Sequence, residues 1–182
     1  MKTNTLQELY VEQLRDLYDA ENQIIKALPK MIEAAKAEEL HNALSEHLEV
    51  TKEQARRLEQ IFETLGEKEK GEKCKGMEGV LKEGSELLKN AGGEEVRDAA
   101  IIAGAQRVEH YEMAGYGTAR TYATLLGDNQ AAELLEKTLE EEKEADQKLS
   151  ELSEEINVQA VDGQQQEYQG AKTAAGKRRR VA

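Results

Sequence analysis

Apolar residues recur every three or four positions along most of this chain, which is the period of an α-helix with one buried face. One such stripe, near the N-terminus, consists of Leu14, Leu17, Ile24 and Leu28. The whole pattern predicts four long helices and one short helix. The long helices are expected at about 5–37, 37–65, 94–126 and 129–157, and the short one at about 77–89.

The lengths of the connections indicate how these helices pack. The links after the first and third long helices are short, which suits antiparallel neighbours, whereas about 28 residues separate the second from the third. The sequence therefore predicts an all-α fold: a ferritin-like antiparallel four-helix bundle with a long crossover, which carries the short helix, over residues 1–157.

The last part of the chain has a different character. From Val158 onward, two acidic residues stand against five basic ones, which are Lys172, Lys177, Arg178, Arg179 and Arg180. The run of Gln and Gly near Gly163 favours a flexible segment. Residues 158–182 are therefore predicted to form a flexible, basic C-terminal tail.

Composition and charge narrow the protein class. Among 182 residues there are one Pro, one Phe and no Trp, so helix formers dominate. No run of apolar residues is long enough to span a membrane, the N-terminus lacks the apolar stretch of a secretory signal, and Cys74 is alone. A cytoplasmic protein is expected. The net charge of −12 argues against nucleic-acid binding, except through the tail.

Three long helices carry an acidic residue on their apolar stripe, near the helix midpoint. Glu21 lies on the stripe of the first, Glu109 and Glu112 on that of the third, and Glu142 on that of the fourth, with Asp146 one turn further. An unpaired charge in a core is costly, so such positions are informative. Helices packed side by side would bring these carboxylates into one interior layer.

The second long helix has no clear acidic residue on its apolar stripe near the helix midpoint. Its stripe brings polar residues to the middle, among them His47, whereas Glu49 lies at the edge of the stripe. Carboxylates gathered in a core either keep their protons or bind a divalent cation, and oxygen ligands with an imidazole suit iron or manganese. The predicted metal site comprises Glu21, His47, Glu49, Glu109, Glu112, Glu142 and Asp146.

Simpler interpretations apply to each residue taken alone. A single glutamate on a stripe is more often an edge residue whose carboxylate reaches solvent. His47 equally suits a hydrogen-bonded core histidine. Tyr18 is expected chiefly to pack, although it lies one turn before Glu21 and is able to hydrogen-bond the site. Agreement among three helix midpoints favours the metal site.

Several short segments together resemble the YciF/YciE family of bacterial stress proteins, over about residues 5–156. The most specific are Val108-Glu109-His110-Tyr111-Glu112 and Thr138-Leu139-Glu140-Glu141-Glu142-Lys143. The others are the segments 17–23, 47–49, 96–100 and 116–118. The resemblance implies a ferritin-like bundle, a homodimer, a ferroxidase-type activity and metal ligation by Glu21, Glu109, Glu112 and Glu142.

One departure from a typical di-iron bundle concerns the Glu-x-x-His pairs. Glu49 is followed three residues later by Lys52, and Glu142 by Ala145, so neither pair is present. The leading hypothesis is thus a stress-response protein with a carboxylate-rich site for one or two iron or manganese ions, oxidising ferrous iron with oxygen or peroxide. Glu109 or Glu142 would bridge the ions. The alternatives are a non-catalytic helical scaffold that binds partners, and a DNA-protecting protein that acts through the basic tail.

Overall fold

The fold of this chain, in a computed structural model, is described for the backbone of residues 3–178 and for the side chains of residues 3–161. Within these residues there are five helices and no strand, which confirms the all-α prediction. The helices are α1 (Leu6–Ala34), α2 (Glu38–Leu65), α3 (Lys75–Asn90), α4 (Glu94–Leu126) and α5 (Asn129–Arg178). None of the helices in this part of the chain is long and apolar enough to cross a membrane.

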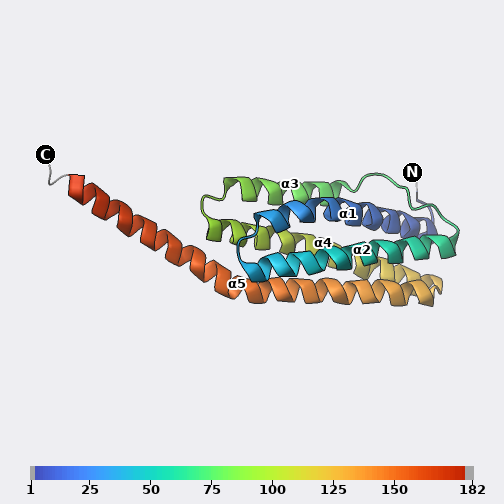
Figure 1. The fold of residues 1–182 in the computed structure, drawn as a ribbon. Helices are drawn as coiled ribbons and strands as arrows, with labels where there is room; N and C mark the ends of the chain where they lie inside the picture. The colour runs from blue at the N-terminus through green and yellow to red at the C-terminus, as the bar shows by residue number, and fades with distance from the viewer. Residues whose placement is uncertain (1–2, 179–182) are drawn as a thin grey trace.

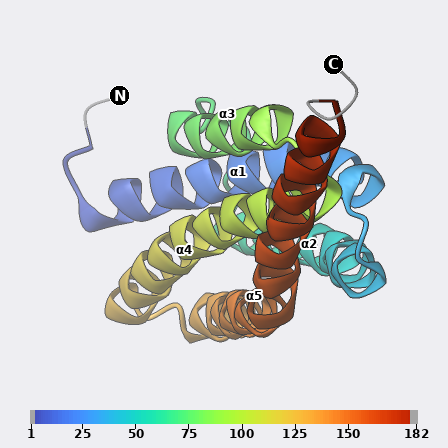
Figure 2. The ribbon, with the colours of Figure 1, turned by 90° about the vertical axis from the view of Figure 1, so that its left-hand side faces the viewer.

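The helices lie side by side in one bundle (Figure 1). α1 packs on α2 and α4, and α5 packs on α4 and α2. The short helix α3, which belongs to the predicted crossover, lies on the outside against α1 and α4 (Figure 2). The interior is therefore lined by α1, α2, α4 and the first part of α5.

Local sequence signals explain most helix ends. Thr5 and Glu8 form a capping box at the start of α1, in which each side chain accepts a hydrogen bond from the other residue's backbone N–H at 3.1 Å. Gly66 and Gly127 follow α2 and α4 with φ of 66° and 81°, a left-handed conformation that glycine adopts without strain.

Two predicted helix ends differ from the structure. α1 ends at Ala34 rather than near residue 37, because Asp98 of α4 binds the backbone N–H groups of Lys36 and Ala37 and holds them outside the helix. The fourth long helix does not end near Asn157 but continues to Arg178. Ala, Gln, Glu and Lys favour helix after residue 157, no proline interrupts them, and each interior glycine costs only about 1 kcal/mol.

This last part of α5 leads away from the other helices (Figure 1). The side chains of its basic residues lie outside the described residues, so the role of the basic tail stays a prediction. The division of the chain at residue 158 likewise stays a prediction.

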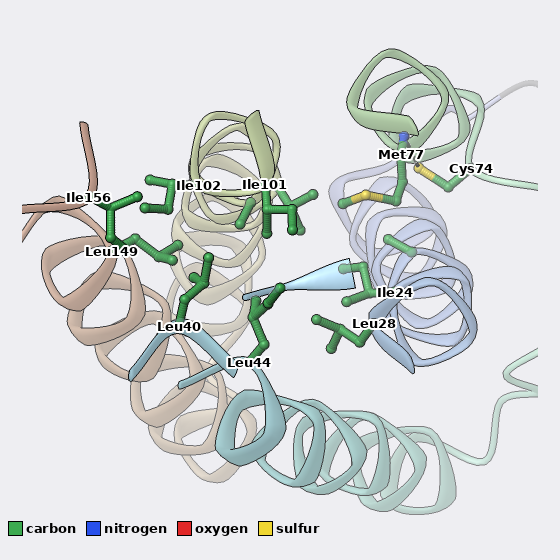
Figure 3. Packing of buried hydrophobic residues seen from close by; sticks show 14 residues of the cluster. Ile24, Leu28, Leu40, Leu44, Cys74, Met77, Ile101, Ile102, Leu149 and Ile156 are labelled. Carbon is green, nitrogen blue, oxygen red and sulfur yellow. Dashed lines mark hydrogen bonds between the residues drawn. The ribbon is translucent and has the colours of Figure 1, made fainter. Parts of the chain in front are cut away.

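The apolar core consists of two clusters. One contains Ile24, Leu28, Leu44 and Ile101 and includes Cys74 and Met77 from the crossover (Figure 3). The other contains Leu14, Leu17, Leu58 and Leu135 at the opposite end of the bundle. Along α1, Glu21 lies close to the point where the residues of the second cluster, which end at Leu17, give way to those of the first, which begin at Ala20, so the polar layer predicted from the sequence lies near the junction of two apolar regions.

Candidate metal centre

Four glutamate side chains are almost completely buried in the middle of the bundle. Glu21 comes from α1, Glu109 and Glu112 from α4, and Glu142 from α5, and none is more than 2% exposed. Each lies on the apolar stripe of its helix, so the helical period that buries the neighbouring Leu, Ile and Ala side chains also buries the carboxylates. The sequence prediction identified all four positions.

These carboxylates and one imidazole converge. Potential ligand atoms of His47, Glu109, Glu112 and Glu142 all lie within 4.8 Å of one another. The Nε2 atom of His47 is 3.5 Å from Oε1 of Glu109, a contact that is too long for a strong hydrogen bond. We call these four residues and Glu21, which interacts electrostatically with Glu142 and Glu112, the carboxylate cluster.

Only a few polar side chains hold the cluster in place. The Tyr116 hydroxyl donates a hydrogen bond to Oε1 of Glu21. The Gln54 side-chain amide donates to Oε1 of Glu142 at 2.5 Å. Five buried atoms of the cluster have no hydrogen-bond partner among the described residues: Glu21 Oε2, His47 Nε2, Glu109 Oε2, Glu112 Oε1 and Glu142 Oε2.

Burial and mutual repulsion change the acidity of the glutamates. Burial, and then the neighbouring charge of Glu142, raise the pKa values of Glu21 and Glu109 well above the usual range. Burial and the charge of Glu21 do the same to the pKa of Glu112, and burial raises the pKa of Glu142 to about 7. Without a cation, the cluster therefore retains protons at neutral pH.

Burial shifts the pKa of His47 in the opposite direction, downward. Loss of solvent lowers the pKa of its imidazole to about 4, so the ring is neutral at pH 7. Its contact with Glu109 is then not an ion pair. A neutral imidazole with an unpartnered Nε2 has a lone pair available for a metal ion.

A buried arginine lies beside the cluster and was not identified from the sequence. Both terminal nitrogens of Arg57 bind the carboxylate of Glu141, at 2.5 and 2.8 Å, and one also donates to Thr138 at 3.1 Å. Arg57 lowers the pKa values of Glu21 and Glu142, against the effect of burial. The pair joins two different helices, so the spacing of residues within one helix does not predict it.

Two predicted ligands lie outside the cluster. Glu49 has a side chain that is 71% exposed and pairs with Lys52 at 2.6 Å. It is two residues from His47, and this spacing turns it to a different side of α2. Asp146 lies at the periphery, where its carboxylate faces Nε2 of His110 at 3.4 Å, and its charge still contributes to raising the pKa of Glu109.

The tyrosine that contacts the cluster is not the one suggested by the sequence. The Tyr18 hydroxyl donates a hydrogen bond to Glu59 at 2.7 Å, and Glu59 is not a member of the carboxylate cluster. Tyr116, which is fully buried, makes the contact with Glu21 instead. Its position on the stripe of α4, one turn after Glu112, was visible in the sequence.

The donor set fits a hard divalent cation. Carboxylate oxygens with one imidazole nitrogen are the ligands preferred by iron and manganese, and ligand atoms of His47, Glu109, Glu112 and Glu142 lie close enough together to hold an ion. A cation there would replace the retained protons and remove the repulsion between the glutamates. The cluster can therefore hold either protons or metal.

Comparison with known proteins gives a consistent set of relatives. Residues 5–162 match the family model described as a domain of unknown function, DUF892. The chain is 45% identical over 154 residues to Protein YciF of Escherichia coli strain K12, covering 84% of this chain and 93% of that protein.

Two solved structures resemble the chain in both sequence and fold. The E. coli stress protein YciF has a TM-score of 0.82 at 44% identity, covering 85% of this chain and 98% of the other. YcfI of Rhodopseudomonas palustris, described as a candidate structural protein, has a TM-score of 0.79 at 46% identity, covering 81% and 94%. A protein of Xanthomonas campestris shares the fold alone, at 21% identity and a TM-score of 0.69 over 88% and 99%.

Proposed function

The chain belongs to the DUF892 family and is a YciF-type protein, and from that premise we propose that it is a ferritin-like stress-response protein that oxidises ferrous iron at its carboxylate cluster. In this proposal α1, α2, α4 and α5 form an antiparallel four-helix bundle of the ferritin type, which assembles as a homodimer in the cytoplasm. The observation that carries the proposal is the set of five buried, unpartnered ligand atoms on the glutamates and His47.

The carboxylate cluster has a donor set suited to iron, with manganese as the alternative ion. Glu109 and Glu142, whose carboxylates interact with each other, would hold the ions together with Glu21, Glu112 and His47. The absence of the usual Glu-x-x-His pairs makes this site richer in carboxylate than a typical di-iron centre.

The redox balance of the proposed reaction is simple. Two ferrous ions each lose one electron, and dioxygen takes up both electrons and two protons to give hydrogen peroxide; with hydrogen peroxide as the oxidant, the products are two waters. The protein's part is to bind the ions, to orient its ligands and to exclude bulk water. Tyr116 orients Glu21, and Gln54 orients Glu142.

Metal content is the direct test. Protein purified aerobically without chelator is compared by elemental analysis with the variant Glu109→Gln/Glu142→Gln, which keeps the side-chain volumes. We expect iron or manganese at about one or two ions per chain in the parent protein and a loss in the variant.

The matched control is Glu49→Gln/Glu140→Gln, which makes the same change of charge at two exposed positions. The control should retain the metal, and all proteins should show the same helical circular dichroism. No uptake by the parent protein, even after anaerobic loading with ferrous ions, would contradict the proposal.

A second candidate function is a non-catalytic structural role. The description of the relative YcfI as a candidate structural protein favours it. In that case the cluster keeps its protons, the metal content is negligible, and the surface rather than the interior carries the function. The same elemental analysis separates the two proposals.

A further inference from the structure

An apolar cavity of about 180 Å³ lies between α1, α3 and α4. Its walls are mostly apolar, among them Ala27, Met31, Leu81 and Val108, and also include Lys30 and Ser85. Close approach of α3 and α4 occurs along this wall, where a methyl group added to Gly104 would lie 3.4 Å from the Cα atom of Gly84. Apolar cavities of about this size bind small apolar molecules or xenon.

This cavity adjoins the carboxylate cluster through a second apolar space. A smaller cavity of about 10 Å³ shares the side chains Ala27, Met31, Leu81 and Val108 with the first. Its other walls include His47 and Glu109. The two cavities therefore adjoin, and the smaller one, which Ile24, Leu28 and Leu44 also line, lies against two members of the cluster (these three side chains are labelled in Figure 3).

The same two side chains are also reached from the opposite side, between α2 and α5, through a cavity of different character. This cavity of about 200 Å³ is lined by His47 and Glu109 together with Glu46, Glu141, Glu144 and Lys148. Of these three additional carboxylates, Glu46 is paired with Lys148 and Glu141 with Arg57, which leaves the carboxylate of Glu144 to attract cations. Apolar side chains, among them Leu44 and Val50, complete the walls. The cluster thus has one approach that carries several ionisable side chains and one that is lined chiefly by apolar side chains.

We propose that dioxygen enters through the apolar cavity between α1, α3 and α4, whereas ferrous ions and hydrogen peroxide enter through the acidic cavity between α2 and α5. Dioxygen is small and apolar, so it partitions into apolar space, which excludes hydrated ions. This inference rests on the proposed function for its redox role. The existence of the gas-binding cavity can be tested separately.

Xenon binding to the metal-free protein is the first test, because xenon occupies the same kind of space as dioxygen. Crystals pressurised with xenon are expected to show an atom bounded by Leu81 and Val108. The variant Ala27→Leu, which fills the shared part of the path, should lose or displace it. Ala132→Leu makes the same change in a separate cavity between α4 and α5 and should leave the xenon in place.

Oxidation kinetics are the second test. In Ala27→Leu loaded with ferrous ions, we expect oxidation by limiting dioxygen to slow about tenfold, or about 1.4 kcal/mol in the barrier. Oxidation by hydrogen peroxide should stay within about twofold of the parent rate, because peroxide enters through the cavity between α2 and α5, which Ala27 does not line. Ala132→Leu should keep both rates. If Ala27→Leu does not fold, the smaller Ala27→Val replaces it.

The outcomes are distinct. Absence of xenon from the parent protein, or an unchanged dioxygen rate in a variant that excludes xenon, overturns the apolar route. Equal slowing with both oxidants also overturns it, since that result indicates damage to the cluster. A protein that binds xenon but no iron or manganese refutes the proposed function and its oxidant route, and leaves the cavity as a gas-binding site without a redox role.

Discussion

Arg57 is a buried cation beside several buried acids. Its side chain is 7% exposed and forms a two-point contact with Glu141, whose side chain is 23% exposed. A buried ion pair contributes little net stability, but removal of one partner leaves the other desolvated and unpaired. Arg57 therefore has two effects: it neutralises Glu141, and it favours the ionised forms of Glu21 and Glu142.

The variant Arg57→Met tests both effects. We expect the free energy of unfolding of the metal-free protein to fall by about 2 kcal/mol, less than for a fully buried pair because Glu141 reaches solvent. Metal uptake should shift to higher pH, because the glutamates then hold their protons more strongly. Urea unfolding and a pH series of metal binding measure the two quantities.

The control for Arg57 is its neighbour Arg56, whose side chain is 63% exposed and pairs with Glu53. Arg56→Met should change stability by less than about 0.5 kcal/mol, as for other exposed pairs. Equal losses for the two variants would contradict a special role for the buried contact.

At the scale of elements, one carboxylate links α4 to the connection between α1 and α2. Asp98 of α4 is buried, and its two oxygens accept hydrogen bonds from the backbone N–H groups of Lys36 at 2.9 Å and Ala37 at 2.7 Å. Ala37 precedes α2 and has no side chain able to cap it. Asp98 thus supplies from a distant helix the negative charge that favours a helix N-terminus.

We expect Asp98→Ala to lower the free energy of unfolding by about 1–3 kcal/mol, because two partly buried N–H groups lose their partner. Asp98→Asn, which keeps one acceptor oxygen, should lose less. Thermal unfolding gives the size of the effect, and hydrogen exchange should speed up at the amides of Lys36 and Ala37. Glu95→Ala, at an exposed position on the same helix, is the control; a loss as large there would contradict the capping role.

At the scale of the whole molecule, the buried glutamates make stability depend on pH. Their folded pKa values lie above the usual 4.5, so the folded metal-free protein binds more protons than the unfolded chain. Their stabilising contribution is complete below pH 4.5 and is lost as the pH rises through the folded pKa values, which for Glu142 is about 7. His47 contributes stability above pH 6.5, and this is lost as the pH falls toward 4.

The metal-free protein should therefore be more stable near pH 5.5 than at pH 8, by about 2 kcal/mol or more, since one pKa unit corresponds to about 1.4 kcal/mol. Urea midpoints across this range measure the difference. Glu109→Gln/Glu142→Gln, which cannot ionise at those positions, should flatten the dependence. Bound metal should reverse it, because cations compete with protons. A midpoint of the metal-free protein that rises steadily to pH 8 would show that the carboxylates ionise freely.

Much of the site could be predicted because helical periodicity is local. The 3.6-residue repeat alone placed Glu21, Glu109, Glu112 and Glu142 on the buried face, since the neighbouring apolar residues had to turn inward. It also predicted the five helices. Burial of these carboxylates follows from the order of residues within each helix.

Only the tertiary structure decided the features that involve more than one helix. The choice between His47 and Glu49 depends on the rotation of α2 about its axis, which its neighbours set. The Arg57–Glu141 contact, the capping of α2 by Asp98 and the apolar cavity beneath α3 each join side chains far apart in the sequence. A one-dimensional repeat determines which face of a helix is buried, whereas the residues that meet across that face are determined by packing in three dimensions.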